Sequence, residues 1–271
     1  MRTFKTWVIG IGLTTCMPLA HADSIPWGLN PALNDRVFVE LGGFFPKMSG
    51  QAQLDSTNGG VGTSVDFQSL LGMSSRASAA DGAIRVRLSE RWRIEASYFQ
   101  LTQSGDRAID RDIHWGGIVY PINTELTSKL QFSDLRVSAG YSIFKTSDKE
   151  VGVGLGLHVL GYKASIRSQT LGSESTDVLA PLPILSFYGQ FALDDQWSVS
   201  TRLDRFSLSY AQYSGGITVI GLDLLYQPFR HVGFGLGYRG MFMNFEDTGS
   251  TLTATLKQSL QGPGLFVTAS F

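Results

Sequence analysis

The sequence predicts an all-β fold, a closed antiparallel up-and-down transmembrane β-barrel of ten strands, with eight strands as the alternative. Three observations lead to this prediction. Apolar residues alternate with small or polar ones along many segments of about ten residues. The connections between these segments are alternately short and long. The last segment keeps the alternation up to an aromatic residue, Phe271, at the final position of the sequence.

The final segment places Leu265, Val267, Ala269 and Phe271 on one face of a strand. Such alternation means that one face meets apolar surroundings, while the other meets small or polar groups. No later segment follows to pair with this strand. We therefore expect it to close on an earlier strand, which is how a barrel avoids an open edge.

The connections set the number of strands. The short ones are residues 89–91, 145–150, 194–196 and 227–231. The long ones are residues 46–78, 105–127, 167–178, 210–215 and 246–256. Nine connections join ten strands, so both ends of the barrel chain lie on the side of the short turns. This asymmetry is typical of bacterial barrels, in which every backbone group must be satisfied within lipid.

Apolar stripes run along the individual strands. Leu135 and Val137 belong to one such stripe. Aromatic residues gather at both ends of the stripes and predict two interfacial girdles, with Trp92, Trp197, Phe144 and Phe229 near the short turns and Tyr98, Tyr210 and Phe242 near the long connections. In the segment that begins at Trp197 the apolar phase slips at Phe206, which predicts a bulge near Arg205.

The opposite face of the strands carries charge. If the apolar stripes face lipid, six acids, six arginines and one histidine point inward. These residues are Glu40, Asp81, Arg85, Arg87, Arg93, Glu95, Asp134, Arg136, His158, Arg202, Asp204, Asp223 and Arg239. Apart from His158, every base among them is arginine, which suits bidentate carboxylate pairs in a confined space. The predicted lumen is therefore a charge network, with glycines at 152, 154 and 156 leaving room for long side chains. The alternative is the solvated face of a soluble sandwich.

The beginning of the chain looks like an export signal. Residues 1–22 combine Arg2 and Lys5 with an apolar stretch, and end in the small-x-small site Ala20-His21-Ala22. Cys16 is the single cysteine and lies within this segment, so cleavage would leave no disulfide. Cys16 also allows a lipoprotein signal, but Thr15 departs from the small residue that such signals carry before the cysteine.

Composition excludes several classes of protein. The 271 residues contain 22 basic and 23 acidic side chains, a balance that does not favour nucleic acid binding. No apolar run of about 18 residues follows the signal, so helical membrane spans are excluded. Four scattered histidines without a further cysteine predict no metal site, and nothing indicates a cofactor.

With its signal segment, alternating strands and terminal Phe271, the chain resembles the small bacterial outer-membrane β-barrels of the OmpA, OmpX and OmpW types, and more weakly the ten-stranded omptins. The resemblance implies residence in the bacterial outer membrane, lipids as neighbours and a monomer. It also implies that Leu265, Val267, Ala269 and Phe271 form the signal read by the barrel-insertion machinery. Residues 23–34 would be a periplasmic lead, and residues 35–271 the barrel.

The function predicted first is that of a non-enzymatic surface protein with a charge-filled lumen and loops that contact an unidentified extracellular ligand. The alternative is a narrow channel or conduit for small or apolar solutes, as in OmpW-like barrels. Under that hypothesis, Phe67, Leu70, Leu71 and Met73 would contact the ligand; otherwise they pack on neighbouring loops. A third hypothesis is a hydrolase at the rim. Omptins use an Asp pair with an Asp–His pair there, and Asp110, Asp112 and His114 share only these residue types.

Overall fold

The structure is a computed structural model that describes residues 29–56, 65–115, 118–210, 213–248 and 252–271. Residues 1–28, which hold the predicted signal and most of the predicted lead, lie outside the described residues. Among the described residues, no helix has the length and apolar character needed to cross a membrane.

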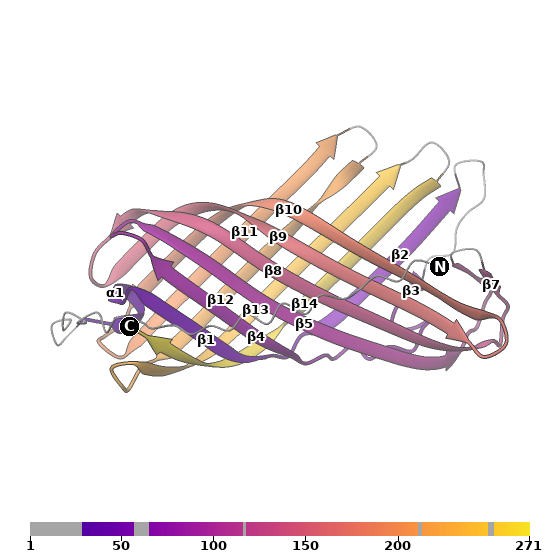
Figure 1. Cartoon of the computed structure of the whole chain (residues 1–271), viewed down its shortest axis with the longest axis horizontal. Coiled ribbons are helices and arrows are strands. Elements are labelled where there is room, and N and C mark those ends of the chain that lie inside the picture. Colours follow the sequence, from indigo (N-terminus) through magenta and orange to yellow (C-terminus); the bar gives the residue numbers. More distant parts are fainter. Residues whose placement is uncertain (1–28, 57–64, 116–117, 211–212, 249–251) are drawn as a thin grey trace, which may run out of the picture.

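Ten antiparallel strands form a closed barrel (Figure 1). They are β1 (Val37–Phe44), β4 (Ala79–Arg87), β5 (Trp92–Ala108), β8 (Glu125–Lys145), β9 (Lys149–Ser168), β10 (Gly172–Ala192), β11 (Trp197–Tyr210), β12 (Tyr213–Tyr226), β13 (Val232–Thr248) and β14 (Leu252–Ser270). Each pairs with the next, and β14 pairs with β1 to close the sheet. The predicted ten-stranded barrel is confirmed, and the eight-stranded alternative is wrong.

The last strand closes on the first. Ser270 lies opposite Phe38, and the backbone N–H of Phe271 donates to the carbonyl of Val37 over 2.9 Å. In return, the N–H of Val37 donates to the Phe271 carbonyl over 2.8 Å. The exposed Phe271 ring stacks on His231 with centroids 5.1 Å apart. The end of the chain therefore completes the hydrogen-bond ladder of the barrel.

Three of the five predicted long loops are strand instead. β9 runs to Ser168 and β10 resumes at Gly172, while β11 and β13 continue to Tyr210 and Thr248. The other two long connections hold short extra strands, namely β2 (Lys47–Ser56) with β3 (Val65–Asp66), and the hairpin of β6 (Ile113–Trp115) with β7 (Ile118–Tyr120). The prediction failed because a strand that stands in water has a polar outer face, which looks like loop in the sequence.

Along each long strand, the apolar side chains face outward in the short-turn half and inward in the far half. In the short-turn half of β8, Leu135 and Val137 point outward, whereas Arg136 is buried in the lumen. In the other half, Leu130 is buried inside and Lys129 is exposed outside. The short-turn half is therefore apolar outside and charged inside, and the far half is polar outside and apolar inside.

The change of apolar face also explains why the apolar alternation shifts at Phe206. The bulge predicted near Arg205 is wrong. β11 pairs with β12 without interruption from Trp197 to Tyr210. Phe206 packs against the apolar core of the far half, so the chemistry of the lumen changes there while the register does not. Among the described strands, the register shift lies between Ser142 and Phe144, in the pairing of β8 with β9.

Beyond the short-turn half, the wall of the barrel divides into two diverging sheets (Figure 1). The first arm consists of the far halves of β5, β8, β9 and β10, and the second of the far halves of β11 to β14 with β2. β10 stays paired with β9 along its length but pairs with β11 only from Leu185 onward. Pro181 and Pro183 stand in the unpaired stretch and have no N–H to donate. On the opposite side, Pro46 lies between β1 and β2 in the sequence. β1 pairs with β4, whereas β2 pairs with the far half of β14.

An apolar core fills the space between the arms. Leu160 of the first arm and Ile217, Met241 and Leu260 of the second are all almost fully buried in it. Residues from the connection between β3 and β4 complete this core. They are Phe67, Leu70, Leu71 and Met73, which are 4–7% exposed.

The short-turn end is closed by a short helix, α1 (Pro31–Asn34). Ala32 and Leu33 are fully buried and pack with Phe38 and Leu225. The part of the predicted lead that the structure describes thus lies in the mouth of the barrel.

Apolar and aromatic side chains cover the outside of the short-turn half. Leu155, Leu222 and Leu265 are more than half exposed there. Near the short turns, Trp92 packs edge-on against Tyr141, and Trp197 stacks on Tyr226. Of the aromatics predicted for the other girdle, Tyr98 and Phe242 are exposed, and the side chain of Tyr210 lies outside the described residues.

Deleting Phe271 should impair assembly, because it removes two closing hydrogen bonds and the stack on His231. We expect at least a several-fold loss of the folded, heat-modifiable form in membrane fractions. Phe229→Ala is the matched control, since this ring is equally exposed in a short turn but closes no strand. Normal yields of folded protein for the deletion variant would contradict the prediction.

Candidate functional site

The lumen of the short-turn half holds a layer of charged side chains. The structure places all thirteen predicted residues there, each of them buried or half-buried. Glu150 joins them, so that six arginines and one histidine meet seven carboxylates. Their contacts form three clusters.

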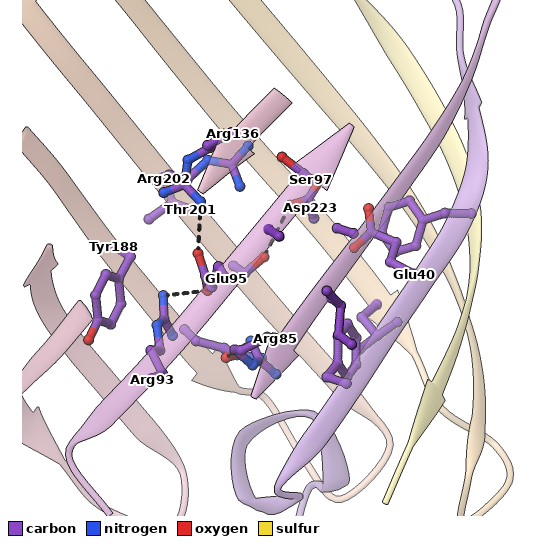
Figure 2. A pocket seen from close by; sticks show the side chains of 18 of the residues that line it. Glu40, Arg85, Arg93, Glu95, Ser97, Arg136, Tyr188, Thr201, Arg202 and Asp223 are labelled. Atoms are coloured by element: carbon purple, nitrogen blue, oxygen red, sulfur yellow. Dashed lines mark hydrogen bonds and ion pairs between the residues drawn. The ribbon is translucent and has the colours of Figure 1, made fainter. Parts of the chain in front are cut away.

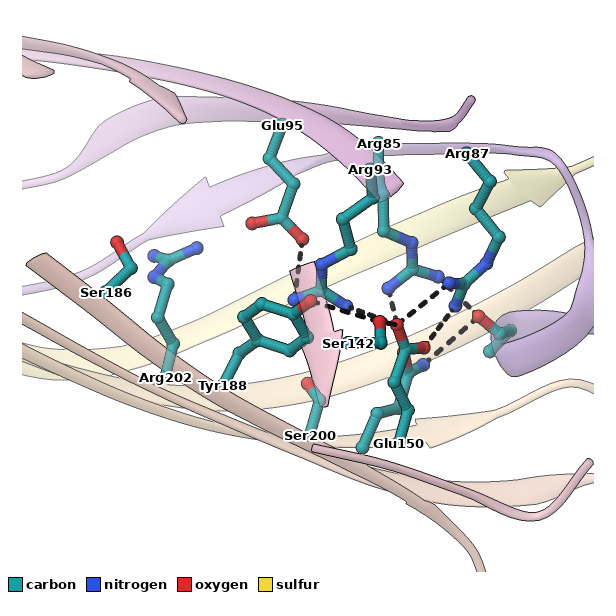
Figure 3. A network of polar contacts seen from close by, with 12 residues as sticks. Arg85, Arg87, Arg93, Glu95, Ser142, Glu150, Ser186, Tyr188, Ser200 and Arg202 are labelled. Atoms are coloured by element: carbon teal, nitrogen blue, oxygen red, sulfur yellow. Dashed lines mark hydrogen bonds and ion pairs between the residues drawn. The ribbon is translucent and has the colours of Figure 1, made fainter. Parts of the chain in front are cut away.

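The first cluster lies near the short turns and centres on Glu150 (Figure 3). Arg87 holds this carboxylate in a bidentate pair with distances of 2.9 and 2.5 Å. The Ser142 hydroxyl donates to it over 2.5 Å, and Arg93 lies 3.6 Å away. Glu150 was not among the predicted lumen residues because it falls in the predicted short connection 145–150. It has the same parity as Gly152 on the inner face of β9, and this signal could have revealed it.

Arg93 links the first cluster to the second. Its guanidinium lies over the Tyr188 ring, 3.2 Å from the centroid, and its Nη2 is 3.1 Å from Glu95. A Cβ on Gly152 would come within 2.3 Å of the Tyr188 hydroxyl. The glycine therefore makes room for an aromatic ring, and the ring supports the arginine.

The second cluster centres on Arg136, which is 2% exposed. Its Nε and Nη2 lie 2.7 and 3.2 Å from the two oxygens of Asp204, and its Nη1 lies 3.2 Å from Glu95. Ser186 donates to Asp204 over 2.5 Å. Four strands, β5, β8, β10 and β11, are thereby joined across the lumen.

His158 belongs to the same cluster. Its Nδ1 lies 2.8 Å from Asp134, and its Nε2 lies 3.4 Å from Asp204. Both ring nitrogens thus face carboxylates, and the side chain is 1% exposed. This enclosure suits a structural role in the network rather than contact with a substrate.

The third cluster borders the apolar core. Arg239 pairs with both oxygens of Asp81 at 2.8 and 3.3 Å, and its guanidinium lies 5.2 Å from the centre of the Phe44 ring. Asp223 accepts a hydrogen bond from Ser200 over 3.2 Å. Within the described residues, Glu40 has no ion-pair partner.

Residues of the second and third clusters, together with Arg85 and Arg93, line a small chamber of about 90 Å³ (Figure 2). Arg85, Arg93 and Arg202 line it together with Glu40 and Asp223. A polar cavity of this size can hold several waters, since one water needs roughly 10–15 Å³ on the same measure.

The rim residues do not form a comparable site. Asp110 pairs with its neighbour Arg111 over 3.3 Å, and both are more than half exposed. Asp112 accepts the backbone N–H of Ile122 over 2.7 Å. His114 lies in the β6–β7 hairpin, and its side chain is outside the described residues. Among the described residues, no three acidic, histidine or cysteine side chains are grouped to hold a metal ion.

Comparison with protein-family models gives no match, and comparison with curated protein sequences gives none either. Among solved structures, the fold is similar to that of the outer membrane protease OmpT from Escherichia coli, with a TM-score of 0.57 and 10% identity over 86% of this chain and 97% of that chain. The outer membrane protein OprG from Pseudomonas aeruginosa gives a TM-score of 0.36 and 10% identity over 88% of this chain and 96% of its own. The toluene transporter TodX from P. putida gives 0.35 and 11% over 89% and 92%.

At 10% identity the likeness to OmpT concerns the fold alone. A closed sheet with an apolar outer face is also the form in which strands cross a bilayer. In such barrels the short turns face the periplasm. The chain therefore has the fold of an outer-membrane β-barrel, and the lumen of its short-turn half holds a buried charged network.

Proposed function

We propose that this protein is a sealed, non-enzymatic outer-membrane barrel that presents its two arms and their connecting segments to an extracellular partner. The proposal is based on the observation that side chains fill both halves of the lumen. A charged layer occupies the membrane half, and an apolar core occupies the half beyond it.

The charged layer supports a closed lumen because its members are held by one another. Asp204, for example, is fully buried and contacts Arg136, Ser186 and His158. Removing one partner of such a buried pair strands the other at a cost of roughly 3–5 kcal/mol. Side chains tied in this way do not move aside readily for a solute.

The apolar core supports it from the other side. Phe67 and Leu71, which the sequence offered as ligand contacts, are themselves buried in the core and occupy the space that a solute would need. The arms outside are polar, as a surface that stands in water requires.

A second candidate function is a conduit for apolar solutes. Two features favour it. Four methionines, Met48, Met73, Met241 and Met243, lie in the apolar core, and methionine adapts its shape to varied partners. The β10 edge beyond Leu185 is unpaired toward β11, so the core is bordered there by a break in the wall.

The wild-type protein should show little or no steady conductance in planar bilayers, because both layers obstruct the lumen. Uptake of a radiolabelled aromatic hydrocarbon into proteoliposomes, compared with empty liposomes, examines the second candidate in parallel. Large ohmic conductance would reject the sealed barrel, and protein-dependent hydrocarbon uptake would move the conduit to first place.

Arg136→Ala should lower the free energy of unfolding by roughly 3–5 kcal/mol, since it leaves Asp204 and Glu95 without their shared partner. Denaturant titration followed by tryptophan fluorescence measures this loss. The control Arg91→Ala removes an exposed arginine and should change stability by only about 0.5 kcal/mol. The double variant Arg85→Ala/Arg136→Ala should also leak ions if it folds. If Arg136→Ala unfolds with the same free energy as the wild type, the charged network does not stabilise the barrel, and the proposal is contradicted.

Asp112→Asn and His114→Ala should change neither the amount of protein at the cell surface nor the phenotype of the cells, because the proposal gives neither residue a catalytic role. Peptide cleavage by intact cells expressing each variant and the parent provides the measurement. A proteolytic activity that is present in the parent and lost in a folded variant would restore the hydrolase hypothesis.

A further inference from the structure

Residues 30–35, which we call the plug segment, lie in the mouth of the barrel at the short turns and form a hydrogen bond with the half-buried Arg85. The Ala32 carbonyl accepts a hydrogen bond from Nη2 of Arg85 and another from Gln190 over 3.2 Å. Arg85 also donates to the side-chain oxygen of Gln190 over 2.9 Å. Among the described residues, no carboxylate lies within ion-pair distance of Arg85; its guanidinium contacts neutral oxygens and lies 4.6 Å from the centre of the Phe38 ring.

The residues that hold the plug segment also line the chamber. Arg85 and Gln190 contact Ala32 on one side and face the chamber on the other. Phe38 and Leu225 likewise pack in the cluster of Leu33 and line the chamber. Withdrawal of the plug segment would therefore uncover two hydrogen-bond donors and open the chamber toward the periplasm.

The plug segment is fastened by contacts outside the chamber. Asn30 donates to the carbonyls of Asp194 and Trp197 over 3.2 and 3.3 Å. Asp35 accepts two hydrogen bonds from Arg230, over 2.7 and 2.9 Å. These contacts lie at the short turns, so they can be removed without altering the chamber.

We propose that Arg85 and Gln190 form a binding site for a small monocarboxylate from the periplasm, and that the Ala32 carbonyl fills this site while the plug segment is closed. A guanidinium with an adjacent amide N–H matches the two oxygens of a carboxylate better than it matches one carbonyl. The chamber of about 90 Å³ limits the ligand to a few non-hydrogen atoms. Its lining includes four arginines and three acids, namely Glu40, Glu95 and Asp223, a balance that leaves one positive charge for a single carboxylate.

This site goes beyond the proposed function and does not depend on it. Residues of the second and third clusters line the chamber, and binding of a ligand there requires no passage through the apolar core. Binding and conductance can consequently succeed or fail separately.

The test is a titration of ¹³C-labelled acetate, followed by NMR line broadening, into the full chain refolded in detergent micelles. The variant Asn30→Ala/Asp35→Ala removes the contacts of these two side chains with the short turns and changes no residue that lines the chamber. It should bind acetate at least ten-fold more tightly than the wild type, because a closed plug reduces the competent fraction of molecules. Phosphate and methylammonium should each bind at least ten-fold more weakly than acetate.

Adding Arg85→Gln to the unfastened variant should abolish acetate binding. Adding Arg91→Gln instead removes an exposed arginine at the same end and should leave binding unchanged. Equal acetate affinity in the wild type and the unfastened variant, or unchanged affinity after Arg85→Gln, would overturn the proposal. If the double variant does not fold, Asn34→Ala serves in its place, since it removes one hydrogen bond to the Ser147 carbonyl. It should then tighten acetate binding measurably, and no change would overturn the proposal.

Discussion

The structure depends on a change of solvent halfway along its strands. In the membrane half the outside is lipid, so the outer face must be apolar and the inner face can carry charge. Beyond the membrane the outside is water, and the apolar face turns inward to form an ordinary core. β8 and β11 cross this boundary with their pairing to β5 and β12 uninterrupted. One hydrogen-bonded sheet thus serves two different environments.

The two fillings of the lumen follow from this change. In the membrane half, arginines meet carboxylates at close range, and pairs such as Arg87 with Glu150 are shielded from bulk water. Beyond the membrane, methionine, leucine and phenylalanine side chains pack between two sheets. Arg239 marks the border, since it pairs with Asp81 on one side and lies over the Phe44 ring on the other.

The membrane half could be predicted from the sequence because its alternation is regular and its turns are short. The alternation of side chains along each strand was enough to predict that Arg136 and Asp204 point inward. Their pairing could not be predicted, since it joins strands far apart in the sequence. The arms could not be predicted in the same way. A polar outer face is usual for loops as well as for solvated strands, and the reversal at Phe206 imitated a bulge. The plug segment was missed because only its contacts with residues such as Arg85 and Arg230 show where it lies.

The prolines of β10 have a consequence for how the molecule can vary in size. Pro181 and Pro183 remove N–H donors where β10 parts from β11, so the ladder between these strands ends at a fixed level. The diameter and strand stagger of the barrel in the membrane half are therefore set below that level, and they do not depend on the lengths of the strands above it. Lengthening a strand pair at its tip by two residues on each side keeps every side chain on its face. The outer portion can thus grow or shrink in such steps, while the part embedded in lipid keeps its diameter.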